Sequence, residues 1–169
     1  MLSNFVKENK VLYIDTDAIV RKDISNVWNY DISNFYVAGV KDYGIIEDGI
    51  IEKYNITGKY INSGFVVFNL DKIRKENIMK QWFKLINTKK LVFPDQDALN
   101  IVCQHHELYL PSMYNSCECY GDRITQEVIN TNLIKVFHYA GPKEYWLADR
   151  LHSEEWYDAE EKFFIEFGI

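Results

Sequence analysis

The sequence feature that most constrains the fold is a short apolar run that ends in two aspartates. Residues 11–14 are Val, Leu, Tyr and Ile, and β-branched and aromatic residues of this kind are typical of a buried strand. Asp15 and Asp17 follow directly. Because residues i and i+2 of an extended chain point to the same face, we expect both carboxylates to lie just past the strand. Two like charges so close repel each other, and a hard divalent cation turns that repulsion into attraction.

The size and composition of the chain predict a single domain that spans residues 1–169. A chain of 169 residues can bury a substantial core, and 47% of its residues are hydrophobic, which argues against disorder. The formal net charge is −6, and no dense run of Lys or Arg occurs. We therefore expect no direct binding to a nucleic-acid backbone.

The cysteines and the hydropathy bear on the compartment. Cys103, Cys117 and Cys119 form no dense framework, and their odd number favours three free thiols in a reducing compartment. The sequence shows no signal-peptide pattern and no apolar stretch long enough to span a bilayer. These features predict a cytoplasmic protein without a transmembrane segment.

Alternating strand and helix patterns predict an α/β domain with a largely parallel or mixed sheet. Ligands of such sheets gather at the carboxyl ends of the strands, where Asp15, Asp17, Asp42 and His138 are expected. Asp95 is expected to cap a helix at its N-terminus. We expect a loop at residues 43–59, strands at 11–14, 35–40, 60–61, 65–68, 108–110 and 133–137, and helices at 24–30, 72–86, 96–103 and 153–167.

Four motifs occur in order along the chain. They are LYIDTD at 12–17, YINSGF at 60–65, DQDALN at 95–100 and HYAGPK at 138–143. Read alone, Asp-x-Asp is a common turn pattern, and a single histidine is more often structural than a ligand. The ordered series resembles family 8 of the glycosyltransferases, which contains bacterial lipopolysaccharide galactosyl- and glucosyltransferases and glycogenin-like enzymes. The resemblance covers residues 11–146.

The resemblance implies a GT-A fold and a hexosyltransferase. Such an enzyme transfers galactose or glucose from a UDP-sugar to a glycan acceptor with retention of the anomeric configuration, as in lipopolysaccharide biosynthesis. The resemblance also implies a divalent cation, Mn²⁺ or Mg²⁺, bound by Asp15, Asp17 and His138 and bridging the donor phosphates. A histidine among oxygen ligands suits manganese better than calcium. A bacterial cytoplasmic location, in peripheral contact with the inner membrane, is implied as well.

The resemblance also gives roles to polar residues of the other motifs. Asp95 would bind hydroxyls of the donor sugar, and Gln96 would lie near the anomeric carbon, so both are catalytic candidates. Gly141 would let the backbone approach the donor phosphates. The full set of implied substrate-binding residues is Asp42, Asn62, Ser63, Asp97, Gly141 and Lys143.

The chain departs from the family pattern at two points. The family motif ends in Lys-Pro-Trp, whereas residues 144–146 are Glu, Tyr and Trp, so Lys143 would have to replace the phosphate-binding lysine. The chain also begins ten residues before the first matched strand, where family members have an upstream nucleotide-binding portion. We therefore expect an N-terminally truncated GT-A domain that binds its donor weakly on its own.

The sequence leaves two alternatives open. A haloacid-dehalogenase-like phosphohydrolase also places Asp-x-Asp after an apolar strand, with the first Asp as nucleophile, but Gln126 stands where a further acid would be needed. The second alternative is a non-catalytic remnant that binds a metal or a glycan. The sequence does not identify the donor sugar, the acceptor or the oligomeric state.

Overall fold

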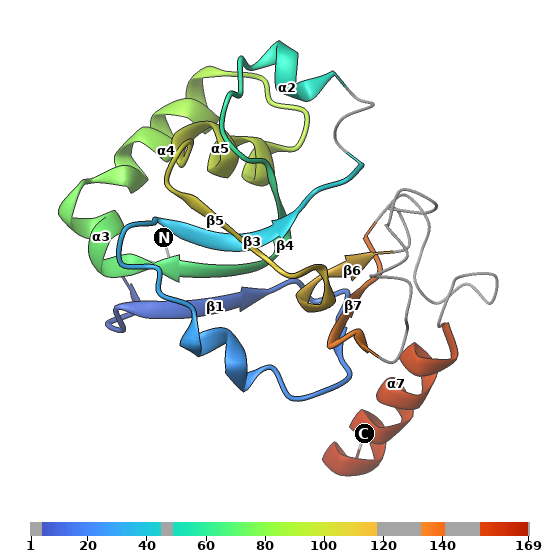
Figure 1. The fold of residues 1–169 in the computed structure, drawn as a ribbon. Helices are drawn as coiled ribbons and strands as arrows, with labels where there is room; N and C mark the ends of the chain where they lie inside the picture. Colours follow the sequence, from blue (N-terminus) through green and yellow to red (C-terminus); the bar gives the residue numbers. More distant parts are fainter. Residues whose placement is uncertain (1–4, 45–48, 118–132, 141–152, 169) are drawn as a thin grey trace.

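The computed structural model describes residues 5–44, 49–117, 133–140 and 153–168, which form two sheets and the helices around them (Figure 1). The larger sheet has the strand order β1-β4-β3-β5, and the smaller sheet has the order β2-β7-β6. The strands are β1 (Lys10–Ile14), β2 (Ala18–Val20), β3 (Val37–Lys41), β4 (Ile61–Asn69), β5 (Glu107–Leu110), β6 (Ser116–Cys117) and β7 (Val136–His138).

The larger sheet is mixed. β4 runs antiparallel to both β1 and β3, whereas β3 and β5 are parallel. This arrangement confirms the predicted α/β architecture with a mixed sheet. Among the residues that the structure describes, β1 pairs with β4 alone, so it forms one edge of this sheet. The carboxyl end of β1 therefore lies beside the beginning of β4, where Ile14 faces Phe65.

Helices cover both faces of the larger sheet. In Figure 1, α3, α4 and α5 lie on one side, and η1 lies on the side of β1. Apolar side chains fill both interfaces, with Ile61 and Leu99 in the core on the α5 side and Val27 and Phe65 in the core on the η1 side. The helices are η1 (Ser25–Asn29), α2 (Ile50–Lys53), α3 (Leu70–Lys75), α4 (Ile78–Thr88), α5 (Pro94–Val102), η3 (Ser112–Tyr114) and α7 (Ser153–Phe167).

Several boundaries differ from those expected. The helix expected at 72–86 is two helices, because Asn77 adopts a left-handed backbone conformation with φ of 55° between α3 and α4. The strand segments expected at 60–61 and 65–68, which the sequence allows as one strand or two, form one strand, β4. Asp95 is not the N-cap of α5, since the helix begins at Pro94 and its N-cap is Phe93. The short elements α2, β2 and β6 were not expected.

The C-terminal helix α7 has the predicted bounds and contacts the body through its first turns. Trp156 packs edge-on against Tyr139 with ring centroids 5.7 Å apart, and Arg21 pairs with Glu155 at 2.8 Å. Its last turns project from the body (Figure 1), and Phe163 and other aromatic residues there are exposed. No helix in the described part of the chain has the length and apolar character needed to cross a bilayer.

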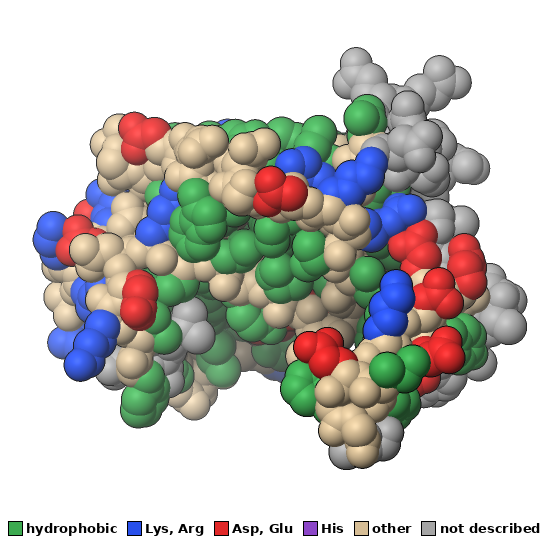
Figure 2. Space-filling view, turned by 90° about the horizontal axis from the view of Figure 1, so that it is seen from below, with side chains coloured by type: hydrophobic (Ala, Val, Ile, Leu, Met, Phe, Trp, Pro, Cys, Tyr) green, Lys and Arg blue, Asp and Glu red, His purple; other side chains and the backbone are tan. Residues whose placement is uncertain are grey.

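The face seen from below carries β1 and η1, and apolar side chains gather at its middle (Figure 2). Tyr13 and Trp28 belong to the exposed large apolar residues of these elements. The cysteines differ from the prediction of three free thiols. Cys103 is free and buried, but Cys117 is disulfide-bonded, and Cys119 lies outside the described residues.

Candidate functional site

Two carboxylates and an imidazole meet at the carboxyl end of β1. The Nε2 atom of His138 lies 3.1 Å from Asp17 Oδ1 and 3.6 Å from Asp15 Oδ2. One ligand atom from each of these three residues lies within 4.8 Å of the other two. Ligand atoms at right angles around an ion, each about 2.1 Å from it, are about 3.0 Å apart, so this spacing fits a small divalent cation.

The backbone brings these side chains together by a turn and a strand pair. Asp15 donates its N–H to Gly64 O of β4, and the N–H of Ala18 returns to Asp15 O at 3.3 Å. Asp15 and Asp17 therefore converge through a turn, and the expected extended geometry is wrong. β2 then pairs with β7, and Ala18 faces His138 in this pair. The pairing brings His138 next to Asp17, although the two residues are 121 positions apart in the sequence.

The second ring nitrogen of His138 is held inside the protein. Nδ1 lies 3.0 Å from Asn115 Oδ1, and both residues are buried. A neutral imidazole whose Nδ1 donates to an acceptor has its lone pair on Nε2, the atom that faces the two carboxylates. Three groups that offer electron pairs toward one point are a donor set suited to a cation, and an oxygen-rich set with one imidazole suits Mn²⁺ or Mg²⁺.

Tyr13 orients one of these carboxylates. Its hydroxyl donates to Asp15 Oδ1 at 2.5 Å, while Asp15 Oδ2 faces His138. This hydrogen bond, with burial and the nearby charges of Asp15, Asp95 and Asp17, raises the pKa of Tyr13 to about 12. Asp95 therefore faces the same region as the acidic pair.

A second group of predicted residues forms a hydrogen-bonded polar cluster beside the first. Gln96 Nε2 donates to Asp42 Oδ2 at 3.0 Å, and Gln96 Oε1 accepts the N–H of Ser63 at 2.9 Å. Asn62 Nδ2 also donates to Asp42 Oδ2, at 3.2 Å. The Ser63 hydroxyl donates to Asp95, whose carboxylate is exposed. The ends of β3, β4 and α5 thus place Asp42, Asn62, Ser63, Asp95 and Gln96 next to one another.

Asp97 differs from these neighbours because its carboxylate is fully buried and holds the start of α5. One oxygen accepts the hydroxyl of Tyr60 at 2.6 Å, and the other accepts the N–H groups of Val92 and Phe93 at 2.9 Å each. Burial and the Asp97 hydrogen bond raise the pKa of Tyr60 far above its ordinary value. The substrate-binding role of Asp97 stays a prediction. Gly141 and Lys143 lie outside the described residues.

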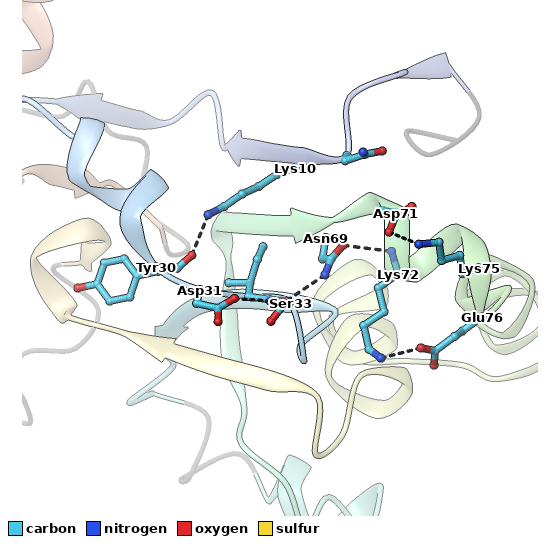
Figure 3. Close-up of a pocket in the computed structure, with 11 residues that line it drawn as sticks. Lys10, Tyr30, Asp31, Ser33, Asn69, Asp71, Lys72, Lys75 and Glu76 are labelled. Carbon is cyan, nitrogen blue, oxygen red and sulfur yellow. Dashed lines mark hydrogen bonds and ion pairs between the residues drawn. The ribbon is translucent and has the colours of Figure 1, made fainter.

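The pocket drawn in Figure 3 lies away from this constellation. It is lined near the start of β1, by Lys10 and by residues of α3, whereas Asp15 follows the end of β1. Lys72 pairs with Glu76 and Lys75 pairs with Asp71 within it. None of the predicted site residues lines this pocket.

Three residues that shape the site were missed in the sequence. Tyr13 shares a strand face with Asp15, so period-2 alternation could have predicted their contact. Gly64 stands in the YINSGF motif, but its role depends on the His138 ring that lies against it. Asn115 lies in none of the four motifs. It comes near His138 only through the pairing of β6 with β7.

Comparisons with known proteins agree with this architecture. The model of glycosyl transferase family 8 matches residues 1–150. General stress protein A of Bacillus subtilis is 40% identical over 108 residues, which are 59% of this chain and 37% of that protein. A lipopolysaccharide 1,2-glucosyltransferase of Escherichia coli is 30% identical over 114 residues, which are 63% of this chain and 34% of that protein. The chain thus spans less than half the length of these curated relatives.

Solved structures show the same fold. The galactosyltransferase LgtC in complex with donor and acceptor sugar analogs gives a TM-score of 0.78 at 24% identity, with 93% of this chain and 63% of that chain covered. GlyE of Streptococcus pneumoniae TIGR4 gives 0.73 at 23% identity, with 93% and 40% covered. These likenesses confirm the predicted GT-A fold, and the family match does not favour a phosphohydrolase. The chain belongs to glycosyl transferase family 8.

Proposed function

We propose that this chain carries the metal-binding and sugar-binding centre of a retaining hexosyltransferase. The enzyme would transfer galactose or glucose from a UDP-sugar to a glycan acceptor. The single observation that carries the proposal is the convergence of Asp15, Asp17 and His138 Nε2 at the carboxyl end of β1. Family membership supports a transferase as the context in which this donor set works.

Asp15, Asp17 and His138 would hold Mn²⁺ or Mg²⁺. The bound ion would supply charge stabilisation to the diphosphate of the departing nucleotide. The chain's own contribution is to keep the donor atoms in place. Tyr13 fixes one oxygen of Asp15, and the buried contact of Nδ1 fixes the ring of His138. Because the ring is buried and the acids are partly exposed, the open side of the site faces solvent.

The polar cluster next to the acidic pair would bind the donor sugar. Asp95 presents an exposed carboxylate that can accept hydrogen bonds from sugar hydroxyls. Gln96 Oε1 accepts the N–H of Ser63 with one lone pair. Its second lone pair would stabilise the positive charge that develops at the anomeric carbon. Asp42 and Asn62, which belong to the same cluster, would hold further hydroxyls. Gly141 and Lys143 stay in the proposal as phosphate contacts.

The relatives support the type of organism and the cellular compartment that we propose. Curated relatives include lipopolysaccharide glucosyltransferases of Escherichia coli. We therefore propose a bacterial, cytoplasmic enzyme at the inner face of the membrane, with a lipopolysaccharide-type glycan as acceptor.

The test uses the 169-residue chain with UDP-glucose or UDP-galactose and Mn²⁺. We expect slow release of UDP that depends on Mn²⁺ and is abolished by Asp17→Ala. Asp23→Ala is a matched control, because the Asp23 carboxylate accepts the N–H and the hydroxyl of Ser25 at the start of η1 and is not one of the three candidate metal ligands. Release of phosphate from a phosphosugar would contradict the proposal and support a phosphohydrolase. Mn²⁺ binding without any UDP release would support the non-catalytic alternative for this chain.

A further inference from the structure

A line of buried polar side chains connects His138 with Asp42. Asn115 is fully buried, and its amide contacts His138 on one side and Asn62 on the other. His138 Nδ1 lies 3.0 Å from Asn115 Oδ1, and Asn115 Nδ2 lies 2.8 Å from Asn62 Oδ1. Asn62 Nδ2 continues the line to Asp42 Oδ2 at 3.2 Å. The line therefore joins the candidate metal site to the polar cluster that would bind the donor sugar.

The fixed groups along the line determine how each amide is oriented. Asn62 Oδ1 accepts the N–H of Gly64 at 2.9 Å, so its Nδ2 faces the Asp42 carboxylate. Asn115 must then give its Nδ2 to the same Asn62 oxygen and its Oδ1 to His138. An amide oxygen only accepts hydrogen bonds. Nδ1 of His138 therefore carries a hydrogen, so Nε2 is the nitrogen that offers a lone pair when the ring is neutral or binds a metal.

We infer that Asn115 is a positioning residue that directs Nε2 of His138 toward the point shared with the Asp15 and Asp17 carboxylates. Histidines that bind metals ordinarily donate their other ring N–H to a fixed acceptor, which sets the tautomer and the ring direction. The role in metal affinity rests on the proposed function, but the tautomer is a property of the chain alone. Because Asn62 belongs to the same line, a rearrangement of the polar cluster would also move His138.

The tautomer can be measured on the unmodified chain without metal or donor. The ¹⁵N chemical shifts of the four histidines distinguish a nitrogen with hydrogen from one with a lone pair. The pH is raised until the shifts of the ring show one nitrogen with hydrogen and one without, which marks the neutral imidazole. The His138 signals are identified by their loss in His138→Gln. We expect hydrogen on Nδ1, and hydrogen on Nε2 would overturn the inference.

Variants of Asn115 test whether this contact sets the metal affinity. Asn115→Ala removes the acceptor, and we expect the affinity for Mn²⁺, measured by EPR titration of the free ion, to fall by about 10- to 100-fold. Asn115→Asp keeps an acceptor beside His138 and is expected to recover most of that loss. Ser116→Ala is the matched control, because the buried Ser116 hydroxyl donates to Ser112 O. We expect this control to leave the affinity unchanged.

The outcomes separate the positioning inference from the proposed function. Equal losses in Asn115→Ala and Asn115→Asp, or an equal loss in Ser116→Ala, would overturn the inference, since a general structural defect predicts them. Circular dichroism shows whether each variant folds, and the tautomer measurement decides the matter if one does not. If the unmodified chain binds no Mn²⁺ but His138 carries hydrogen on Nδ1, the proposed function fails while the assigned ring orientation is supported.

Discussion

The imidazole of His138 lies directly against the backbone of Gly64. A Cβ added at Gly64 would lie 2.1 Å from Cε1 of the ring and 2.5 Å from Nδ1. Both distances are far shorter than ordinary van der Waals contact. Gly64 is therefore required by its neighbour, and not by a left-handed backbone conformation. Through this contact, β4 of the larger sheet sets how close β7 of the smaller sheet can bring its histidine.

Gly64→Ala is expected to displace His138 and to weaken Mn²⁺ binding by at least about tenfold, since a metal ligand moved away from its partners loses its aim. The crowding itself costs about 1–3 kcal/mol of unfolding free energy. Gly39→Ala in the neighbouring strand is the control, because its Cβ would crowd Ile61 Cδ1 at 2.8 Å and its nearest neighbours include no atom of the histidine. EPR titration and urea denaturation measure the two effects. Unchanged Mn²⁺ affinity in a folded Gly64→Ala chain would contradict the prediction.

The local pattern predicted the strands and the carboxyl ends where the polar residues gather. The run before Asp15 and the helical spacing after Ser153 are local signals, so β1 and α7 were found from them. Strand β2 has only three residues, and no local pattern distinguishes it from a loop. The strand exists because it pairs with β7, more than a hundred residues later.

The site was predictable where chemistry is carried by residue type, and unpredictable where it depends on contacts. Asp15, Asp17 and His138 were named in advance because they stand in an ordered series of motifs that resembles a metal-dependent family, and not because of any one motif alone. Asn115 gave no signal, since its role exists only once β6 lies beside β7. The cap of α5 was assigned to Asp95 because caps commonly stand at that position, yet Asp97 holds the preceding N–H groups.

Asp97 is expected to act mainly on stability. Asp97→Ala removes the acceptor of the buried Tyr60 hydroxyl and of the part-buried N–H groups of Val92 and Phe93, and the Val92 N–H also contacts Tyr54 Oη. Leaving the buried hydroxyl unpaired costs about 1–3 kcal/mol, whereas the part-buried N–H groups can bind water, so we expect a loss of about 1–3 kcal/mol in urea denaturation. Asp95→Ala, which removes an exposed carboxylate, is the control and should leave stability within about 0.5 kcal/mol. If Asp97→Asn lost UDP-sugar binding while it kept full stability, the substrate-binding role would be favoured instead.

The docking of α7 is expected to depend on Trp156. Trp156→Ala removes the edge-on contact with Tyr139, so we expect α7 to be cleaved faster by a protease while Mn²⁺ affinity stays unchanged. Tyr157→Ala is the matched control, because its neighbouring side chain is 45% exposed. Limited proteolysis followed by mass spectrometry measures the effect. Equal cleavage rates in the two variants would show that this ring contact does not hold the helix.

Glu107 gives the stability of the chain a predictable pH dependence. Its side chain is buried, Oε1 accepts the N–H of Lys59, and Oε2 has no hydrogen-bond partner in the described residues. Burial raises the pKa of this carboxyl above its ordinary value. A raised pKa in the folded state means that its contribution to stability is fully present below the unfolded pKa. That contribution is lost as the pH rises through the folded pKa.

Glu107→Gln removes this titration, so the variant should gain stability relative to the unmodified chain as the pH rises from about 4 to about 8. Urea denaturation of both chains at several pH values measures the difference in unfolding free energy. Glu160→Gln on the exposed face of α7 is the control and should show no such trend. A difference between Glu107→Gln and the unmodified chain that is constant with pH would mean that the carboxyl titrates alike in the folded and unfolded states. The buried Oε2 would then have to be solvated, although the neighbouring Oε1 is held against Gly58 and the N–H of Lys59.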